Sequence, residues 1–308
     1  MEISAKGVLF ASLGLVGAVF IAVWAREARR ARPPGAPVWP TALQLGIGFV
    51  TDFLDTLGVG SFATTTSMFK LGGVVADENI PGTLNVGHAV PTFAEAIIFI
   101  LVVNVEMTTL VLMIAAAVVG AWLGAGVVAR WPRRRVQLGM GALLFVAAAI
   151  IVARLTKTVP GGGDALGLSG ARLAAGLAGN FVLGALMTLG IGLYAPCMIL
   201  VSLLGMNATT AFPIMMGSCA FLMPAASIRF VRSGRYDLRA ALGLTLAGTP
   251  AAVLAGLVVK SLPVAAVNWL VVGVVVYTAS AMLSSARSSG SSQPTAAPSA
   301  TPASKESA

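Results

Sequence analysis

The chain has 308 residues, of which 57% are hydrophobic and 10% are charged. This composition excludes an ordinary soluble domain and indicates a membrane protein, because several apolar runs reach the roughly 18 residues that cross a bilayer. The net charge of +9 does not indicate nucleic-acid binding, since Lys and Arg cluster in short segments between apolar runs, as the positive-inside rule describes.

The first apolar run, Gly7–Ala25, is followed directly by four arginines: Arg26, Arg29, Arg30 and Arg32. A basic cluster after an apolar run is typical of a stop-transfer anchor rather than of a cleaved signal peptide. We therefore expect an extra N-terminal transmembrane helix and a basic cytoplasmic loop over residues 1–38.

A duplicated motif follows in the apolar runs Trp39–Phe69 and Ala171–Leu204, each longer than 30 residues. The segment Phe49–Gly73 matches Phe181–Gly205, at an offset of 132 residues, in 10 of 25 positions. Internal duplication in a membrane protein is typical of secondary transporters. We expect an all-α polytopic fold with two homologous repeats.

Each repeat is expected to hold one long run and three further spans. The spans are Leu84–Val103, Met107–Ala129 and Val136–Ala153, and then Phe212–Phe230, Leu238–Val259 and Val264–Leu283. The expected divisions are a first repeat over 39–155, a Gly-rich linker over 156–170, a second repeat over 171–285 and a disordered Ser/Ala/Pro-rich tail over 286–308, with the change in composition starting at Ser284.

Glycines interrupt both long runs, at Gly58-Val59-Gly60 and at Gly190-Ile191-Gly192. If each run folds back there, 15 of the 20 Lys and Arg lie on the cytoplasmic side, against 13 for straight crossings. Half of such a run is too short to cross the roughly 30 Å hydrocarbon core. We therefore expect broken or re-entrant first helices and an inverted second repeat, with a bent full span as the alternative.

A helix that restarts after a glycine break exposes free N–H groups and the positive end of its dipole, which suits a small anion. The alternative is that the glycines only allow close helix packing. The residues that we expect to bind substrate lie at the breaks and on the next span: Thr56, Gly58, Gly60, Ser61, Thr64, Thr65, Asn85, Thr188, Gly190, Gly192, Tyr194 and Cys197.

Four titratable residues are candidates for proton coupling. Asp52 and Asp55 lie three residues apart on one helical face, just before the first break. His88 and Glu95 share a face of the following span with Asn85 and Thr92. Acidic and histidine side chains at membrane depth usually line a polar cavity, although capping of broken backbone by the acids and a structural role for a lone histidine are the alternatives.

At these residues the chain resembles the sulfite exporter TauE/SafE family, also called TSUP or DUF81. The resemblance rests on Thr51–Thr66, on Ile80–His88 and on the two four-segment repeats, and it covers roughly Trp39 to Leu283. It implies a multi-pass carrier of the bacterial inner membrane for small sulfur-containing anions such as sulfite, thiosulfate or sulfonates.

The sequence as a whole predicts a secondary transporter of a small anion, coupled to protons at the four titratable residues. A cation carrier or channel that uses the same acids is the alternative, and a membrane scaffold is a third class. The two cysteines, Cys197 and Cys219, have no metal-ligand spacing, and no enzyme motif is present. We expect no cofactor, metal or catalytic residue, a lipid environment, and helix faces compatible with a homo-oligomer.

Overall fold

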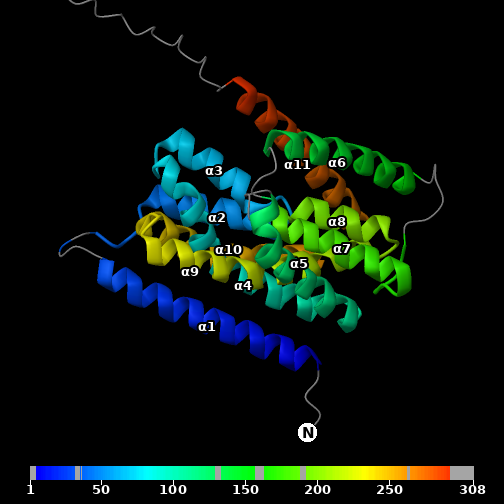
Figure 1. Ribbon diagram of the computed structural model, residues 1–308, viewed down its shortest axis with the longest axis horizontal. Helices are drawn as coiled ribbons and strands as arrows, with labels where there is room; N and C mark the ends of the chain where they lie inside the picture. The colour runs from blue at the N-terminus through cyan, green and yellow to red at the C-terminus, as the bar shows by residue number, and fades with distance from the viewer. Residues whose placement is uncertain are drawn as a thin grey trace, which may run out of the picture.

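The computed structural model describes residues 5–31, 35, 37–128, 133–156, 163–187, 192–261 and 264–291. These residues form eleven α-helices, two short 3₁₀ helices and no strand (Figure 1). Five segments of this part of the chain are long and apolar enough to cross a membrane: Ala5–Ala31, Asp77–Val102, Gly170–Met187, Ala208–Ser233 and Leu238–Val259. The all-α fold with these spans indicates a multi-pass membrane protein.

The helices after α1 (Ala5–Ala31) follow one order twice. The first set is α2 (Ala42–Thr56), α3 (Ser61–Gly72), η1 (Asp77–Asn79), α4 (Ile80–Val102), α5 (Met107–Val128) and α6 (Arg133–Leu155). The second set is α7 (Gly170–Met187), α8 (Tyr194–Leu203), η2 (Ala208–Thr210), α9 (Ala211–Ser233), α10 (Leu238–Ser261) and α11 (Val264–Ser291). The last four elements of the second set each start 131 residues after their counterparts.

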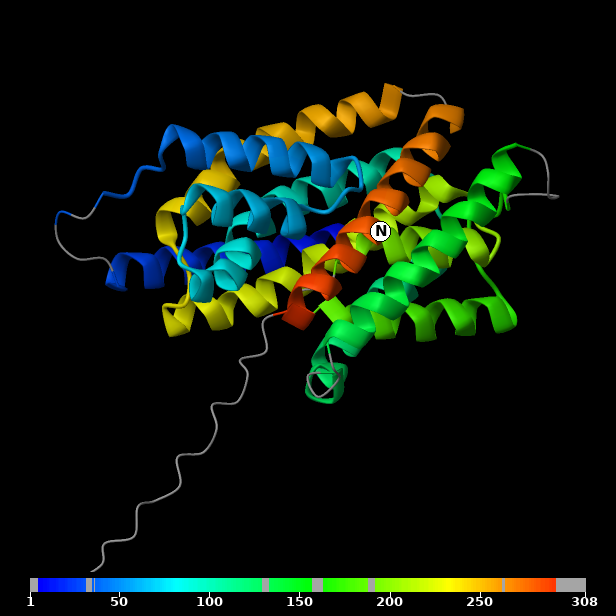
Figure 2. The ribbon, with the colours of Figure 1, turned by 90° about the horizontal axis from the view of Figure 1, so that it is seen from above.

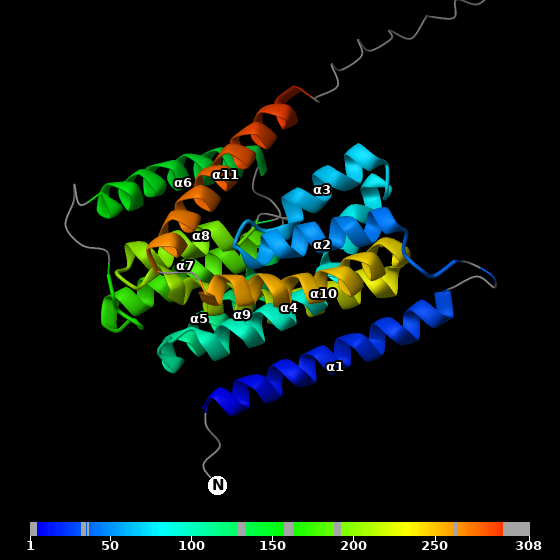
Figure 3. The same cartoon turned by 180° about the vertical axis from the view of Figure 1, so that it is seen from behind.

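Two helix hairpins enter the bundle from opposite ends. Hairpin 1 consists of α2 and α3, and hairpin 2 consists of α7 and α8. In hairpin 1, the chain turns back so that α3 runs beside α2 toward the end where α2 began (Figures 2 and 3). The turn is tight because Gly58 and Gly60 have φ of 95° and 86°, which residues with a Cβ rarely adopt. The turn of hairpin 1 lies beside α8, because a Cβ on Gly58 would lie 3.2 Å from Met198.

Helices α4 and α9 pack on each other at the centre, and each hairpin packs on a helix of the other set. Helix α2 lies against α10, and α7 lies against α5. Both contacts need glycine, since a Cβ on Gly48 would lie 2.6 Å from the carbonyl oxygen of Gly243, and one on Gly184 would overlap the carbonyl of Ala117. The packing is thus reciprocal between the two sets.

The remaining helices lie at the periphery. Helix α1 runs along the outside of α9 and α4, where Gly17 contacts the ring of Phe93 and Phe20 stacks on Trp24. Helices α6 and α11 pack on each other and contact α8 (Figure 1). Helix α11 continues to Ser291, past the point where the sequence predicted a disordered tail, and residues 292–308 lie outside the described part.

The two sets share the way in which α5 and α10 begin. Glu106 accepts hydrogen bonds from the N–H groups of Thr108 and Thr109, and Asp237 accepts one from the N–H of Ala240. These acids satisfy backbone donors at a helix N-terminus. The described part of the expected linker also packs near this region, because the Glu106 N–H donates to the carbonyl of Leu166.

Candidate functional site

The last turn of α2 places polar side chains in the interior of the bundle. Asp52, Asp55 and Thr56 are 0%, 3% and 0% exposed. They face α4, whose own polar residues His88, Thr92 and Glu95 are all fully buried. We call Asp52, Asp55, His88 and Glu95 the acid cluster.

His88 joins the two helices of hairpin 1. Its Nδ1 lies 2.7 Å from Oδ1 of Asp52 in α2, and its Nε2 lies 3.0 Å from the hydroxyl of Thr65 in α3. A carboxylate on Nδ1 favours a proton there, so Nε2 accepts from Thr65 when the ring is neutral and donates to it when the ring is charged. Hydroxyl, imidazole and carboxylate thus form a chain along which a proton can move.

Asp55 caps the second helix of its own hairpin. Its Oδ1 accepts a hydrogen bond of 2.6 Å from the backbone N–H of Ser61, the first residue of α3. The sequence predicted that this N-terminus would face an anion, and in this structure the anion is the side chain of Asp55. A negative group at a helix N-terminus is favourable, so any substrate anion must compete with Asp55 for this donor.

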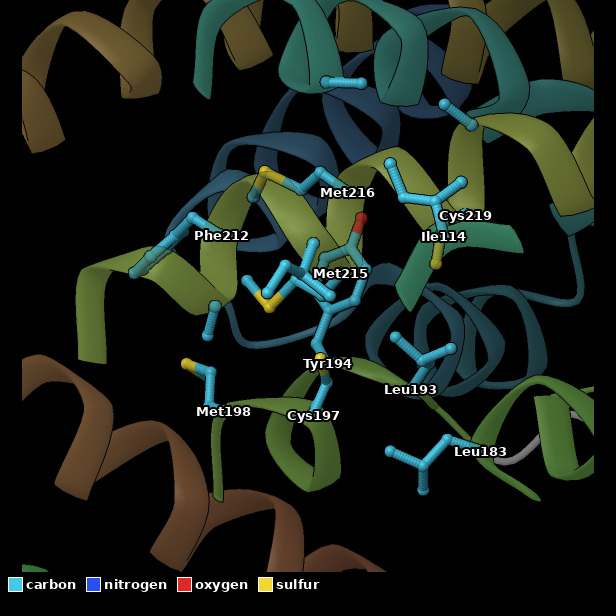
Figure 4. Close-up of a cluster of buried hydrophobic side chains, with 14 of the residues drawn as sticks. Ile114, Leu183, Leu193, Tyr194, Cys197, Met198, Phe212, Met215, Met216 and Cys219 are labelled. Carbon is cyan, nitrogen blue, oxygen red and sulfur yellow. The ribbon is translucent and has the colours of Figure 1, made fainter. Parts of the chain in front are cut away.

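Glu95 connects hairpin 1 to hairpin 2. Its Oε1 lies 2.7 Å from the hydroxyl of Thr56 in α2, and its Oε2 lies 3.1 Å from the phenol oxygen of Tyr194, the first residue of α8. Figure 4 shows Tyr194 among Met215, Cys197 and Cys219 of α8 and α9. The acid cluster therefore lies where the last turn of α2 meets the first turn of α8.

The carboxyl group of Asp52 is only half satisfied. Its Oδ2 is buried without a hydrogen-bond partner in the described part of the chain. This oxygen points at α10, because a Cβ on Gly248 would overlap it. A buried acceptor without a partner costs free energy, and a proton, an ion or a water molecule at this oxygen would remove that cost.

The acid cluster contains three carboxyl groups and a single imidazole. Among the described residues, no lysine or arginine forms an ion pair with any of the three acids, and Asp52 pairs only with His88. Burying an unpaired charge costs several kcal/mol per ion. The single imidazole can neutralise only one of the three carboxylates, so the cluster is a place where a proton or a cation would lower the cost of burial.

The other predicted residues lie around this centre. Gly58 forms the turn of hairpin 1, where an added Cβ would lie 3.2 Å from Met198 of α8. The hydroxyl of Thr64 donates to backbone carbonyls of its own helix, and the Asn85 amide donates to the carbonyl of Pro81. Asn85 is thus on the predicted face of α4 but is not part of the acid cluster.

The predicted residues of hairpin 2 contribute less polar chemistry. Cys197 is fully buried among apolar side chains, and Gly192 is exposed. Thr188 and Gly190 lie outside the described residues. In hairpin 2 the contact to the acid cluster comes from Tyr194, whose hydroxyl bonds to Glu95.

Sequence reasoning missed two features of α10 that bear on the site. Gly248 admits the carboxyl group of Asp52, and Thr245 donates a hydrogen bond of 2.8 Å to the carbonyl of Gly87 in α4. The sequence signal was the polar interruption Gly248-Thr249-Pro250 in an otherwise apolar helix. Small residues in a membrane helix allow another helix to approach closely.

No protein-family model, curated protein or solved structure matches this chain.

Proposed function

We propose that the protein is a secondary transporter of a small anion, coupled to protons and located in a bacterial inner membrane. The observation that carries the proposal is the meeting of two oppositely directed hairpins at a buried acid cluster. Discontinuous helices that meet between two repeats are the common plan of binding sites in such carriers.

The proposal includes two inverted repeats with re-entrant hairpins. Three further helices separate hairpin 1 from hairpin 2, and an odd number of crossings inverts the second set. The reciprocal contacts of α2 with α10 and of α7 with α5 support this arrangement. The basic ends of α1, α3 and α9 support a cytoplasmic side at the open end of hairpin 1.

Asp55 gives the transporter its coupling step. In its ionised form Asp55 holds the N–H of Ser61, and a neutral carboxyl group is a weaker acceptor. Protonation of Asp55 therefore frees the N-terminus of α3 for the substrate anion, so that one proton and one anion bind together. The hydroxyl of Tyr194 is a second donor on the opposite hairpin.

The resemblance to TauE/SafE carriers supports a sulfur-containing anion. The experiment is flux of sulfite, thiosulfate, sulfoacetate and taurine into proteoliposomes, with and without a pH gradient. Saturable flux of one of these anions that responds to the gradient supports the proposal. No flux of any of them through folded protein would overturn the assignment of sulfur-containing anions.

A cation carrier is the second candidate, because Asp52 Oδ2 is buried without a partner and Asp55 occupies the anion-binding end of α3. The two functions differ in the behaviour of Asp55→Asn. Loss of all binding and flux indicates a cation that the carboxylate holds directly. Anion flux that persists but no longer depends on pH indicates the anion carrier.

A further inference from the structure

Glu95 is the one member of the acid cluster whose hydrogen bonds, in the described structure, reach both hairpins. His88 bonds to Asp52 and Thr65, which both belong to hairpin 1. Asp55 bonds to Ser61 within hairpin 1. Glu95 itself lies on α4 and belongs to neither hairpin. Its carboxyl group therefore contacts Thr56 of hairpin 1 and Tyr194 of hairpin 2 at the same time.

The number of protons available for the hydrogen bonds of Thr56 indicates whether Glu95 is protonated when it bonds to both Thr56 and Tyr194. The Thr56 hydroxyl lies 2.8 Å from the carbonyl oxygen of Asp52 and 2.7 Å from Oε1 of Glu95. A hydroxyl has one proton, and within a helix it commonly donates to the carbonyl four residues earlier. If Thr56 donates to that carbonyl, Glu95 must be protonated to donate to Thr56, while Tyr194 donates to Oε2.

The ionised form of Glu95 has two hydroxyl neighbours but, among the described residues, no cationic partner. Three titratable groups face Glu95: Asp52 and Asp55 from α2, and Tyr194 from α8. Cys219 of α9 lies next to Tyr194. His88 is on the same helix as Glu95, two turns earlier. His88 is already paired with Asp52. No described cation compensates an ionised Glu95, so water that enters between Thr56 and Tyr194 would stabilise it.

We propose that Glu95 is a proton-dependent latch between the two hairpins. Protonated Glu95 bridges Thr56 and Tyr194 and holds the hairpin turns together around a dry site. Ionised Glu95 favours water entry and separates them. That the latch gates transport rests on the proposed transport function. The pH-dependent motion of the hairpins requires no substrate.

The test measures the separation of the hairpins directly. Spin labels are placed at the exposed positions Ala63 on α3 and Leu203 on α8, after Cys197 and Cys219 are replaced by alanine. Pulsed electron spin resonance then gives the distance distribution in liposomes, without substrate, across a pH titration. We expect a short distance at low pH and a growing long-distance population as the pH rises.

Two variants identify the group responsible. Glu95→Gln keeps a neutral acceptor for Tyr194 and a donor for Thr56, so it stays in the short-distance state at every pH. Tyr194→Phe removes the bond to hairpin 2 and shows the long-distance population at every pH. Glu106→Gln, at an exposed site outside the cluster, is the matched control and follows the wild-type titration.

An infrared measurement covers the case in which a variant alters the fold. Protonated buried carboxyl groups absorb at their own C=O stretching frequencies, and the component of this absorption that is missing from Glu95→Gln disappears from the wild-type spectrum over the same pH range. A pH-independent distance in the wild type, or a wild-type response in Glu95→Gln, overturns the latch. A pH-dependent latch in a protein that moves no anion supports the latch and refutes the transport function instead.

Discussion

In hairpin 1 the last turn of α2 buries Asp52 and Asp55, whereas the matching turn of α7 carries Gly184 and Met187. Beyond the turn, Thr65 of α3 bonds to His88, while its counterpart, Cys197 of α8, lies among apolar side chains. The backbone plan is duplicated and the polar chemistry is not. Architecture and chemistry therefore respond to different residues and can be tested separately.

The largest effect is expected where the two hairpins are alike. Gly48→Leu in α2 and Gly184→Leu in α7 each force a side chain into the backbone of the facing helix. Both variants should lose more than the roughly 1–3 kcal/mol of ordinary overpacking and fail to yield monodisperse protein. Thermal unfolding in detergent measures the loss.

Gly46→Ala is the control for this pair. Gly46 is also in α2 and has open space where a Cβ would lie, so the variant should fold normally. If Gly184→Leu folds well while Gly48→Leu does not, the reciprocal packing of the two sets is not a shared requirement.

The next largest effect is expected at Asp52, an acid of hairpin 1 that has no counterpart in hairpin 2. Asp52→Asn removes the carboxylate that pairs with His88, and proton-driven flux should fall by about tenfold or more, since a general acid–base group commonly contributes that much. Asp77→Asn, an exposed acid near η1, should leave flux unchanged. Equal flux in Asp52→Asn and wild type would remove Asp52 from proton coupling.

Gly248→Ala tests the contact between α10 and the carboxyl group of Asp52. The added methyl group overlaps Oδ2 of Asp52, so the carboxyl group must move. We expect a destabilisation of about 1–3 kcal/mol together with weaker proton coupling. Combining it with Asp52→Ala should relieve the destabilisation, and a purely additive double variant would show that the two residues do not interact.

A smaller difference is expected between matched positions of α3 and α8. Thr65→Val leaves Nε2 of His88 without its partner and should cost about 1–3 kcal/mol. Cys197→Ala removes one small apolar group and should cost about 1 kcal/mol. Only Thr65→Val should change the pH profile of flux, and a changed profile in Cys197→Ala would show that chemistry is shared between the hairpins.

The smallest effect concerns Glu106, at the start of α5. Hydrogen bonds from Thr109 and Thr108 lower the pKa of Glu106 from 4.5 to about 2. A lowered pKa adds stability above pH 4.5 that declines as the pH falls toward 2. Glu106→Gln should lose about 1 kcal/mol or less near neutral pH, and its difference from wild type should shrink in acid. A constant difference across that range would assign the effect to packing.

The helices and the glycine turn at Gly58 and Gly60 could be predicted from sequence because apolar run length and glycine spacing are local signals. The second predicted break lies mostly outside the described residues. Helical spacing placed Asp52 and Asp55 on one face of their helix, and His88 and Glu95 on one face of the next span. That these two faces meet is a tertiary contact that spacing does not contain. Asn85 shares that spacing but lies one turn nearer the start of α4, where its side chain bonds to Pro81 instead.

Other parts of the site depend on contacts that spacing does not contain. The bond from Ser61 to Asp55 requires the exact turn of hairpin 1, and the bond from Tyr194 to Glu95 spans 99 residues. The contact of Gly248 with Asp52 depends on how α10 crosses α2. Such contacts are set by tertiary packing, so periodicity along a single chain does not reveal them.

The most direct test of the central claim is proton movement driven by an anion. Proteoliposomes that enclose a pH-sensitive dye receive each sulfur-containing anion in turn, with wild-type protein or Asp55→Asn. We predict that one anion acidifies the lumen through the wild type, and that Asp55→Asn carries the same anion without moving protons. Anion flux without any proton movement in the wild type, or equal proton movement in Asp55→Asn, would contradict the account.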